Sequence, residues 1–153
     1  MALSIKLDLQ SAVNSSTVVP EVTDVQTWVA AVLQGRFDEP VELTIRIVEE
    51  SESAQLNETY RNKQGSTNVL SFPYDGEIAL SPVLLGDVVV CAPVVINEAR
   101  VQGKSLKSHW CHMIIHGVLH LLGYDHITDQ EAEEMEAEEV SIMAALQYDN
   151  PYK

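Results

Sequence analysis

Long apolar runs, cysteines and basic residues are all scarce in this sequence of 153 residues. The most apolar stretch, residues 88–96, spans nine residues, whereas a membrane-spanning helix needs about 20. The chain does not open with a basic segment followed by an apolar run, so we expect no secretion signal. Cys91 and Cys111 lie among apolar neighbours and fit buried free thiols better than a disulfide or a metal pair. These shortages predict a cytoplasmic protein with no membrane partner.

Acidic residues greatly outnumber basic ones, with 23 Asp and Glu against 9 Lys and Arg and a net charge of -14. Nucleic-acid-binding surfaces are usually basic, so this balance argues against a broad, salt-driven affinity for RNA. Small basic groups remain, and the charge therefore does not argue against a local phosphate site. These groups are Arg61 with Lys63, and Arg100 with Lys104 and Lys107.

Half of the acidic excess lies in residues 127–153, which hold eight acids and one base. A helix this acidic cannot face RNA without repulsion. One interpretation is a solvated face that keeps a small protein soluble, and the other is a docking surface for a basic partner. The glutamates concerned are Glu131, Glu133, Glu134, Glu136, Glu138 and Glu139.

The apolar pattern predicts one compact domain over residues 1–153, of the α+β (α/β-like) class. About four strands and five helices alternate along the chain, which favours a small mixed, mostly parallel sheet with helices packed on it. Ser105 and Thr128 can cap helices, and Gly123 can end one. The predicted strands are 4–10, 41–48, 68–73 and 86–91, with a loop or wide hairpin over 74–85. The first four predicted helices are 21–33, 51–61 (opening near Ser51), 93–103 and 105–123. The fifth is an acidic helix that begins at Thr128 and points Ala132, Met135, Val140 and Met143 inward.

The stretch HGVLHLLGYDH, residues 116–126, has the spacing H-x-x-x-H-x-x-G-x-x-H of a metzincin zinc site. His116 and His120 are four residues apart and project from one face of a helix. Gly123 can turn the chain back, so that His126 arrives as a third ligand. Three imidazoles and an open position form the catalytic zinc arrangement, which can activate water or a phosphate. Several divalent metals accept such ligands.

The general-base glutamate of the peptidases is missing, because Gly117 occupies its position. This glycine counts against a peptidase and is compatible with phosphodiester cleavage, in which a cation and an arginine stabilise phosphoryl charge. A peptidase or amidase would need an acid from elsewhere, such as Glu58, Asp87 or Asp125. A non-catalytic, metal-stabilised assembly factor is the other alternative, and would need His112 or Asp125 to close the metal shell.

All five histidines lie between positions 109 and 126. His109 and His112 fall near the face that carries the proposed ligands, and we expect them to be buried and hydrogen-bonded, with His112 a candidate to support a ligand. Asp125 has two open interpretations. It is either a turn residue or the partner that orients the His126 imidazole.

The motif resembles the signature H-G-x-L-H-L-x-G-Y-D-H of the YbeY family of bacterial metal-dependent endoribonucleases. Three further segments are similar to elements of that family in the same order. They are NETYR at 57–61, TNVLSFP at 67–73 and LGDVVV at 85–90.

The resemblance implies a single-strand-specific endoribonuclease that matures the 3′ end of 16S ribosomal RNA and acts in ribosome quality control. It implies one zinc ion per chain on His116, His120 and His126, with Arg61 as the functional arginine. The implied fold is a small α+β domain with a mostly parallel sheet. The implied partners are single-stranded ribosomal RNA and the small ribosomal subunit. Under the docking interpretation of the acidic helix, a basic ribosomal protein of that subunit binds there. Without the resemblance, the motif alone indicates a zinc hydrolase.

Overall fold

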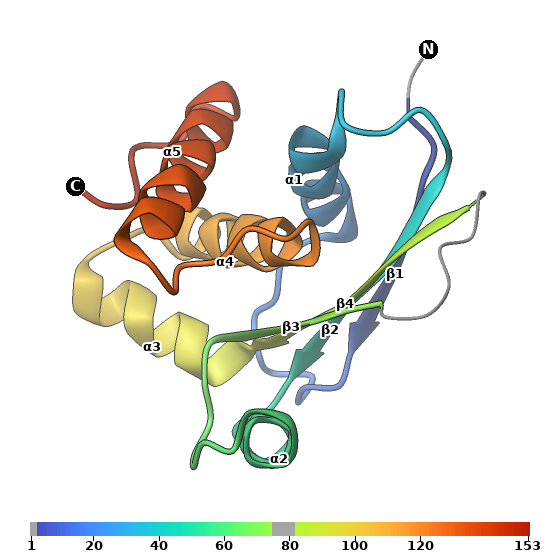
Figure 1. Ribbon diagram of the computed structural model, residues 1–153. Coiled ribbons are helices and arrows are strands. Elements are labelled where there is room, and N and C mark those ends of the chain that lie inside the picture. The colour runs from blue at the N-terminus through green and yellow to red at the C-terminus, as the bar shows by residue number, and fades with distance from the viewer. Residues whose placement is uncertain (1–2, 75–81) are drawn as a thin grey trace.

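The computed structural model describes residues 3–74 and 82–153, and a four-stranded sheet forms its centre (Figure 1). The strand order is β1-β2-β4-β3, with β1, β2 and β4 parallel and β3 antiparallel to β4 at one edge. The strands are β1 (Ile5–Ser11), β2 (Val41–Val48), β3 (Val69–Pro73) and β4 (Val83–Cys91). The helices are α1 (Val22–Leu33), α2 (Glu50–Arg61), α3 (Ala92–Gln102), α4 (Leu106–Leu121) and α5 (Asp129–Ala145).

Side chains that alternate along the strands build a core on each face of the sheet. On β4, Val88 and Val90 belong to the main core beneath α1, α4 and α5. Val89 and Cys91 point the other way into a smaller core that Leu56 of α2 covers. Helix α2 therefore lies on the face of the sheet opposite α4, as Figure 1 shows, and Val94 of α3 also packs against this smaller core.

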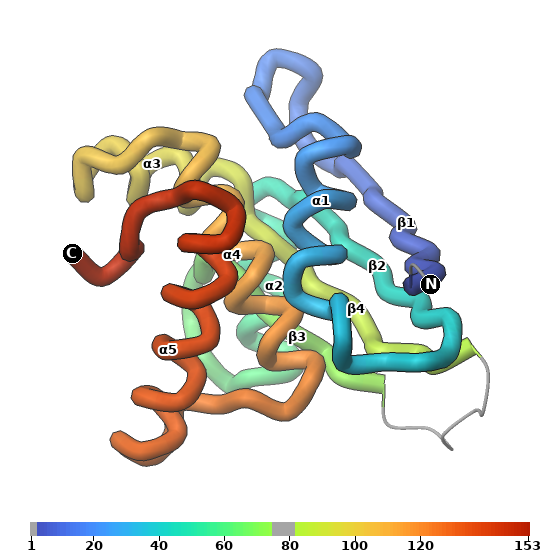
Figure 2. The backbone as a smooth tube through the Cα atoms, turned by 90° about the horizontal axis from the view of Figure 1, so that it is seen from above, coloured from blue at the N-terminus to red at the C-terminus, as the bar shows by residue number. Residues whose placement is uncertain are grey.

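Helix α4 is the central helix, because it contacts β3, β4, α1, α3 and α5. Seen from above, it runs between α1 and α5 (Figure 2). Its Trp110, Ile114, Ile115 and Leu119 are almost completely buried. The Ser105 hydroxyl accepts a hydrogen bond from the Ser108 backbone N–H at 3.1 Å and so caps the first turn, as predicted. A helix held on so many sides is a rigid carrier for the histidines along it.

Helix α4 approaches the sheet closely at Gly117. A Cβ atom at this position would lie 2.5 Å from Val88 Cγ1 and 3.1 Å from Val69 Cγ2. The Gly117 carbonyl also accepts a hydrogen bond of 2.8 Å from the Ser71 hydroxyl on β3. The position at which a metallopeptidase keeps its glutamate is thus filled by the sheet, and a glutamate side chain has no room here.

The predicted fold class is confirmed, because the described part of the chain forms five helices and a mixed, mostly parallel four-stranded sheet. Cys91 and Cys111 are buried free thiols, as expected. Thr128 caps α5 by accepting a hydrogen bond from the Glu131 N–H, also as expected. In residues 3–74 and 82–153, no helix is both long and apolar enough to cross a bilayer.

The predicted start of β4 was wrong. The strand begins at Val83, which pairs with Val41 of β2, whereas the sequence pattern predicts a loop up to Leu85. Gly86 was taken as the boundary of the strand, but it lies inside it, where a bulge shifts the register and a side chain would collide with the Phe72 carbonyl. Residues 75–81 of the predicted loop lie outside the described part of the chain.

The buried face of α5 also differs from the prediction. Met135 and Met143 are buried as predicted, but Val140 is only partly buried. In its place the helix buries Glu139, with no exposed surface at all. Glu139 was therefore wrongly counted among the solvated glutamates. The physical reason is a set of hydrogen-bond partners that α4 and the C-terminal segment provide.

We expect Gly117→Ala to destabilise the protein by about 1–3 kcal/mol, because the methyl group must displace the stiff, buried Val88 side chain. At this chain length the unfolding temperature should fall by roughly 2–4 °C per kcal/mol. Thermal unfolding followed by circular dichroism measures the change.

The double variant Gly117→Ala/Val88→Ala serves as the control, because it restores the space. It should lose less stability than the sum of the two single losses. Additive losses would show that the two positions do not compete for the same volume.

Candidate metal centre

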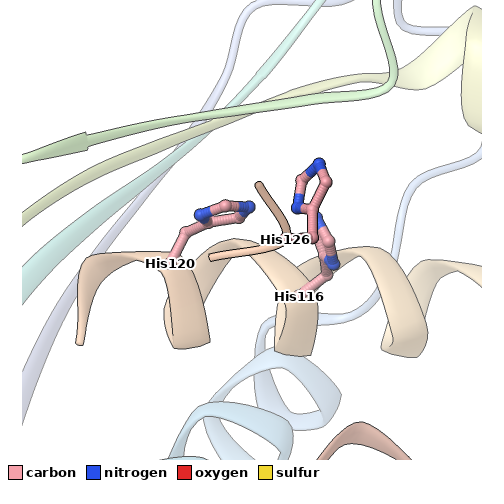
Figure 3. Close-up of side chains that lie close together, drawn as sticks. All are labelled: His116, His120 and His126. Carbon is pink, nitrogen blue, oxygen red and sulfur yellow. The ribbon is translucent and has the colours of Figure 1, made fainter. Parts of the chain in front are cut away.

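Three histidines from two parts of the chain come together at the end of α4 (Figure 3). His116 and His120 lie one turn apart on α4, and His126 reaches them from the loop that leads to α5. One ring nitrogen from each residue lies within 4.8 Å of the others. His116 and His120 are partly buried, whereas His126 is exposed.

The helix end explains how His126 reaches the other two histidines. Helix α4 stops at Leu121, and Gly123 adopts a positive φ of 101°, which an ordinary side chain would resist. The Gly123 N–H donates to the His120 carbonyl at 3.0 Å, and the Tyr124 N–H donates to the Leu119 carbonyl at 3.1 Å. These bonds satisfy the last carbonyls of the helix and turn the chain back over its own end.

The buried carboxylate of Glu139 contacts one of the three histidines. Its Oε2 lies 3.2 Å from His116 Nδ1, and its Oε1 lies 3.0 Å from His112 Nε2. With Nδ1 of His116 hydrogen-bonded in this way, Nε2 is the ring nitrogen left for a metal ion. His112 is buried and hydrogen-bonded, and it supports Glu139 rather than joining the histidine cluster.

The electrostatics suit metal binding. Burial would raise the pKa of the Glu139 carboxyl, but hydrogen bonds from His112, His116 and Tyr152 hold that pKa at about 2. Glu139 is therefore an anion near neutral pH. Burial lowers the pKa of His120, and the neighbouring His116 and His126 lower it further. A lowered pKa favours the neutral imidazole, which is the form that ligates a metal.

The cluster offers three protein ligands. In the part of the chain that the structure describes, no fourth histidine, cysteine or carboxylate joins the group. Asp125 behaves as a turn residue, since its Oδ1 accepts from the His126 backbone N–H at 2.7 Å but lies 3.9 Å from His126 Nδ1. Three imidazoles fit zinc and related divalent ions, and they leave coordination positions open for water or a substrate.

The three histidines line a cleft of about 1000 Å³. Its two walls carry opposite charges. Arg61 and Lys63 stand on the α2 and β3 side, and Glu136 stands on the α5 side. The small basic group that the sequence showed at Arg61 and Lys63 therefore lies across the cleft from the acidic helix.

Arg61 is held in place by two contacts with β3. Its Nη2 donates to the Ser71 carbonyl at 2.5 Å, and its guanidinium carbon lies 5.5 Å from the centre of the Phe72 ring. The helix end beneath it is also fixed, because the Asn57 side chain donates to the Gly65 carbonyl at 3.0 Å. Arg61 remains exposed, so the other N–H groups of its guanidinium can reach an anion in the cleft.

The remaining candidate residues lie elsewhere. Glu58 is exposed on α2, and Asp87 lines a separate hollow with Lys6 and Thr44. Neither residue lines the cleft of the histidines. His109 is buried as expected, and its Nε2 lies 2.9 Å from Glu98 Oε1.

Two residues of this site, Glu139 and Tyr152, were not predicted from the sequence. The Tyr152 hydroxyl donates to both Glu139 oxygens, at 2.5 and 3.0 Å. A signal for Glu139 existed, because position 139 falls on the helical face of Met135, Ile142 and Met143. No pattern in the sequence marked Tyr152.

Comparison with known proteins agrees with this geometry. The family model described as endoribonuclease YbeY matches residues 10–147. Among solved structures, the solution structure of TM1509 from Thermotoga maritima is similar, with a TM-score of 0.57. The two chains are 23% identical, and the match covers 94% of this chain and 91% of that chain. At that identity the likeness shows the fold.

We predict one metal ion per chain, held by His116, His120 and His126. Elemental analysis of wild type should give one equivalent, and His116→Ala/His120→Ala should lose it. Metal at 100 times its Kd should stabilise the wild type by about 2.7 kcal/mol, which differential scanning calorimetry of stripped and reloaded protein measures.

His109→Gln is the matched control, because it alters a histidine of the same helix that faces Glu98 and not the cluster. It should retain the metal. Equal metal content in the double variant and the wild type would contradict the assigned ligands.

Proposed function

Because the chain belongs to the YbeY family of endoribonucleases, we propose that it is a zinc-dependent endoribonuclease specific for single-stranded RNA. Membership makes it a metal-dependent endoribonuclease of ribosomal RNA processing. The finer proposal is that it matures the 3′ end of 16S ribosomal RNA and acts in ribosome quality control. The observation that carries the catalytic part is the three-histidine cluster in one cleft with an exposed arginine.

The role proposed for Arg61 follows from the charge that phosphodiester cleavage creates. Negative charge accumulates on the phosphoryl oxygens in the transition state, and a guanidinium can donate two parallel hydrogen bonds to them. The contacts of Arg61 with Ser71 and Phe72 fix the guanidinium at the cleft before substrate arrives. Less conformational freedom is then lost when the phosphate binds.

The three histidines complement this role from the floor of the cleft. They would hold a divalent cation, which supplies Lewis-acid stabilisation of charge on the phosphate. His116 and His120 are fixed by the rigid helix, and His116 also by Glu139. Arg61 and the histidines thus line one cleft, and we propose that a single phosphate binds between them.

A peptidase is the weaker alternative because the two carboxylates that contact the histidines, Glu139 and Asp125, are already hydrogen-bonded. Position 117 is filled by the sheet, and Glu139 is occupied by three hydrogen-bond partners. Asp125 is already bonded to the backbone of His126. A purely structural zinc site normally has four protein ligands, whereas this cluster has three.

The charged walls of the cleft favour single-stranded RNA. A single strand can place its phosphates toward Arg61 and Lys63 while its bases face away. A duplex carries phosphates on both sides and would bring one backbone toward the acidic wall at Glu136. This asymmetry supports the single-strand specificity that we propose.

The outer face of α5 supports a docking role for a basic protein surface. Glu133 and Glu134 are exposed, whereas Glu138 bonds Arg36 and Glu139 is buried. The acidic surface available to a partner is therefore smaller than the six glutamates of the sequence suggested. We place a basic ribosomal protein of the small subunit there, because the weak RNA affinity of so acidic a chain calls for a second source of specificity.

RNA cleavage tests the proposal directly. Metal-stripped protein should leave a short single-stranded RNA intact, and reconstitution with zinc should restore cleavage. The same sequence annealed to its complement should resist. Denaturing gel electrophoresis of end-labelled RNA measures both, with His120→Ala as the control for contaminating nucleases. Cleavage by stripped protein or by His120→Ala at the wild-type rate would refute the assignment.

Arg61→Lys should retain the charge but lose the planar, two-bond grip and the Ser71 contact. Cleavage should fall roughly 10- to 100-fold while metal content stays at one equivalent. Single-turnover rates measure the loss of cleavage, and elemental analysis of the same protein shows whether metal is lost.

Arg100→Lys is the matched control, since Arg100 is an exposed arginine on α3 and bonds Asn97. It should cleave at the wild-type rate. Wild-type cleavage by Arg61→Lys would show that Arg61 acts only as an ordinary exposed cation.

A further inference from the structure

The carboxylate of Glu139 joins a metal ligand to the C-terminal segment of the chain. It is fully buried, yet each oxygen has partners. His112 and His116 approach it from α4 at 3.0 and 3.2 Å, and the Tyr152 hydroxyl approaches at 2.5 and 3.0 Å. Three residues from two separate segments thus converge on one side chain.

Tyr152 is itself held by several contacts. The Lys104 ammonium donates to the carbonyl of the buried Pro151 at 2.6 Å, and the Tyr152 N–H donates to Asn150 Oδ1 at 2.8 Å. Its ring meets the His112 ring edge-on, with 5.4 Å between the centroids. The hydroxyl is therefore presented to Glu139 by a segment that is anchored at three points.

A buried carboxylate is energetically unfavourable at this position if its only role is to fill space. Burying a charge carries a large desolvation cost, and an apolar side chain of similar size often stabilises a core as well or better. The neighbouring inward positions of α5 hold Met135 and Met143, which shows that an apolar side chain suits this face. The presence of a charge here points to a task beyond packing.

We propose that Glu139 is a positioning residue for the metal ligand His116, and that Tyr152 holds Glu139 in that role. The carboxylate accepts the Nδ1–H of His116, which fixes the tautomer with a bare Nε2 and sets the plane of the ring. The Tyr152 hydroxyl donates to both oxygens and stops the carboxylate from rotating away. Tyr152 lies outside residues 10–147, the part that matches the family model. The inference rests on the metal site of the proposed function and not on its RNA substrate.

The test measures metal binding without RNA. Apo wild type, Glu139→Gln and Tyr152→Phe are titrated with zinc against a chromophoric chelator, and with cobalt(II) to record the visible spectrum. Glu58→Gln removes the same charge from an exposed position outside the cleft, and Tyr148→Phe removes a hydroxyl from the same segment. Thermal unfolding of each apo protein reports any purely structural effect.

Glu139→Gln should bind zinc about 10- to 100-fold more weakly than wild type and change the cobalt spectrum. Tyr152→Phe should weaken binding in the same direction by a smaller factor. The two controls should match wild type.

Wild-type affinity and spectrum in Glu139→Gln, with only a lower unfolding temperature, would overturn the positioning role. If Glu139→Gln does not fold, Tyr152→Phe decides, because that side chain is 48% exposed and its ring is retained. Unchanged or tighter binding by Tyr152→Phe would overturn the role of the tyrosine. A wild-type protein that binds neither metal would remove the metal site itself, and the proposed function would fail separately from the positioning of His116.

Discussion

The contact between α4 and β3 at Gly117 and Ser71 is the constraint on which the site depends. The Ser71 hydroxyl donates to the Gly117 carbonyl, and the Ser71 carbonyl accepts from the Arg61 guanidinium. One buried serine thus ties the helix that carries His116 to Arg61, the last residue of α2. The approach is possible only because Gly117 has no side chain. Gly117, which occupies the position of the peptidase glutamate, is therefore the residue that allows α4 to contact the sheet.

This arrangement reconciles a strongly acidic chain with a phosphate substrate. The net charge of -14 would repel RNA from most of the surface, but the cleft has one basic wall. Recognition then depends on short-range contacts with one or a few phosphates rather than on a long-range field, and it survives moderate salt. The acidic wall restricts how RNA can enter, and the outer face of α5 remains available for a protein partner.

The sequence predicted the parts of the site that local geometry determines. The four-residue spacing of His116 and His120 and the turn at Gly123 are local, and the structure brings these residues together with His126. The strands and helices were predictable for the same reason, except at Gly86, where pairing with a distant strand overrides the local signal. Periodicity places position 139 on the inward face of α5, but the charge of a glutamate favoured the apolar Val140, and the partners that permit its burial, His112 and Tyr152, lie on other segments. The place of Arg61 in the cleft likewise depends on how α2 packs against β3, and the expectation for it came from family resemblance.

The central claim is that Arg61 and the three-histidine cluster act on the same phosphate. A crystal structure of the metal-loaded protein with a short, non-cleavable single-stranded RNA analogue tests this most directly. The account predicts one backbone phosphate that contacts both the Arg61 guanidinium and the ion held by His116, His120 and His126, with the neighbouring phosphates along the Lys63 wall. RNA bound outside the cleft, or a phosphate that contacts Arg61 while the histidines face only solvent, would contradict it.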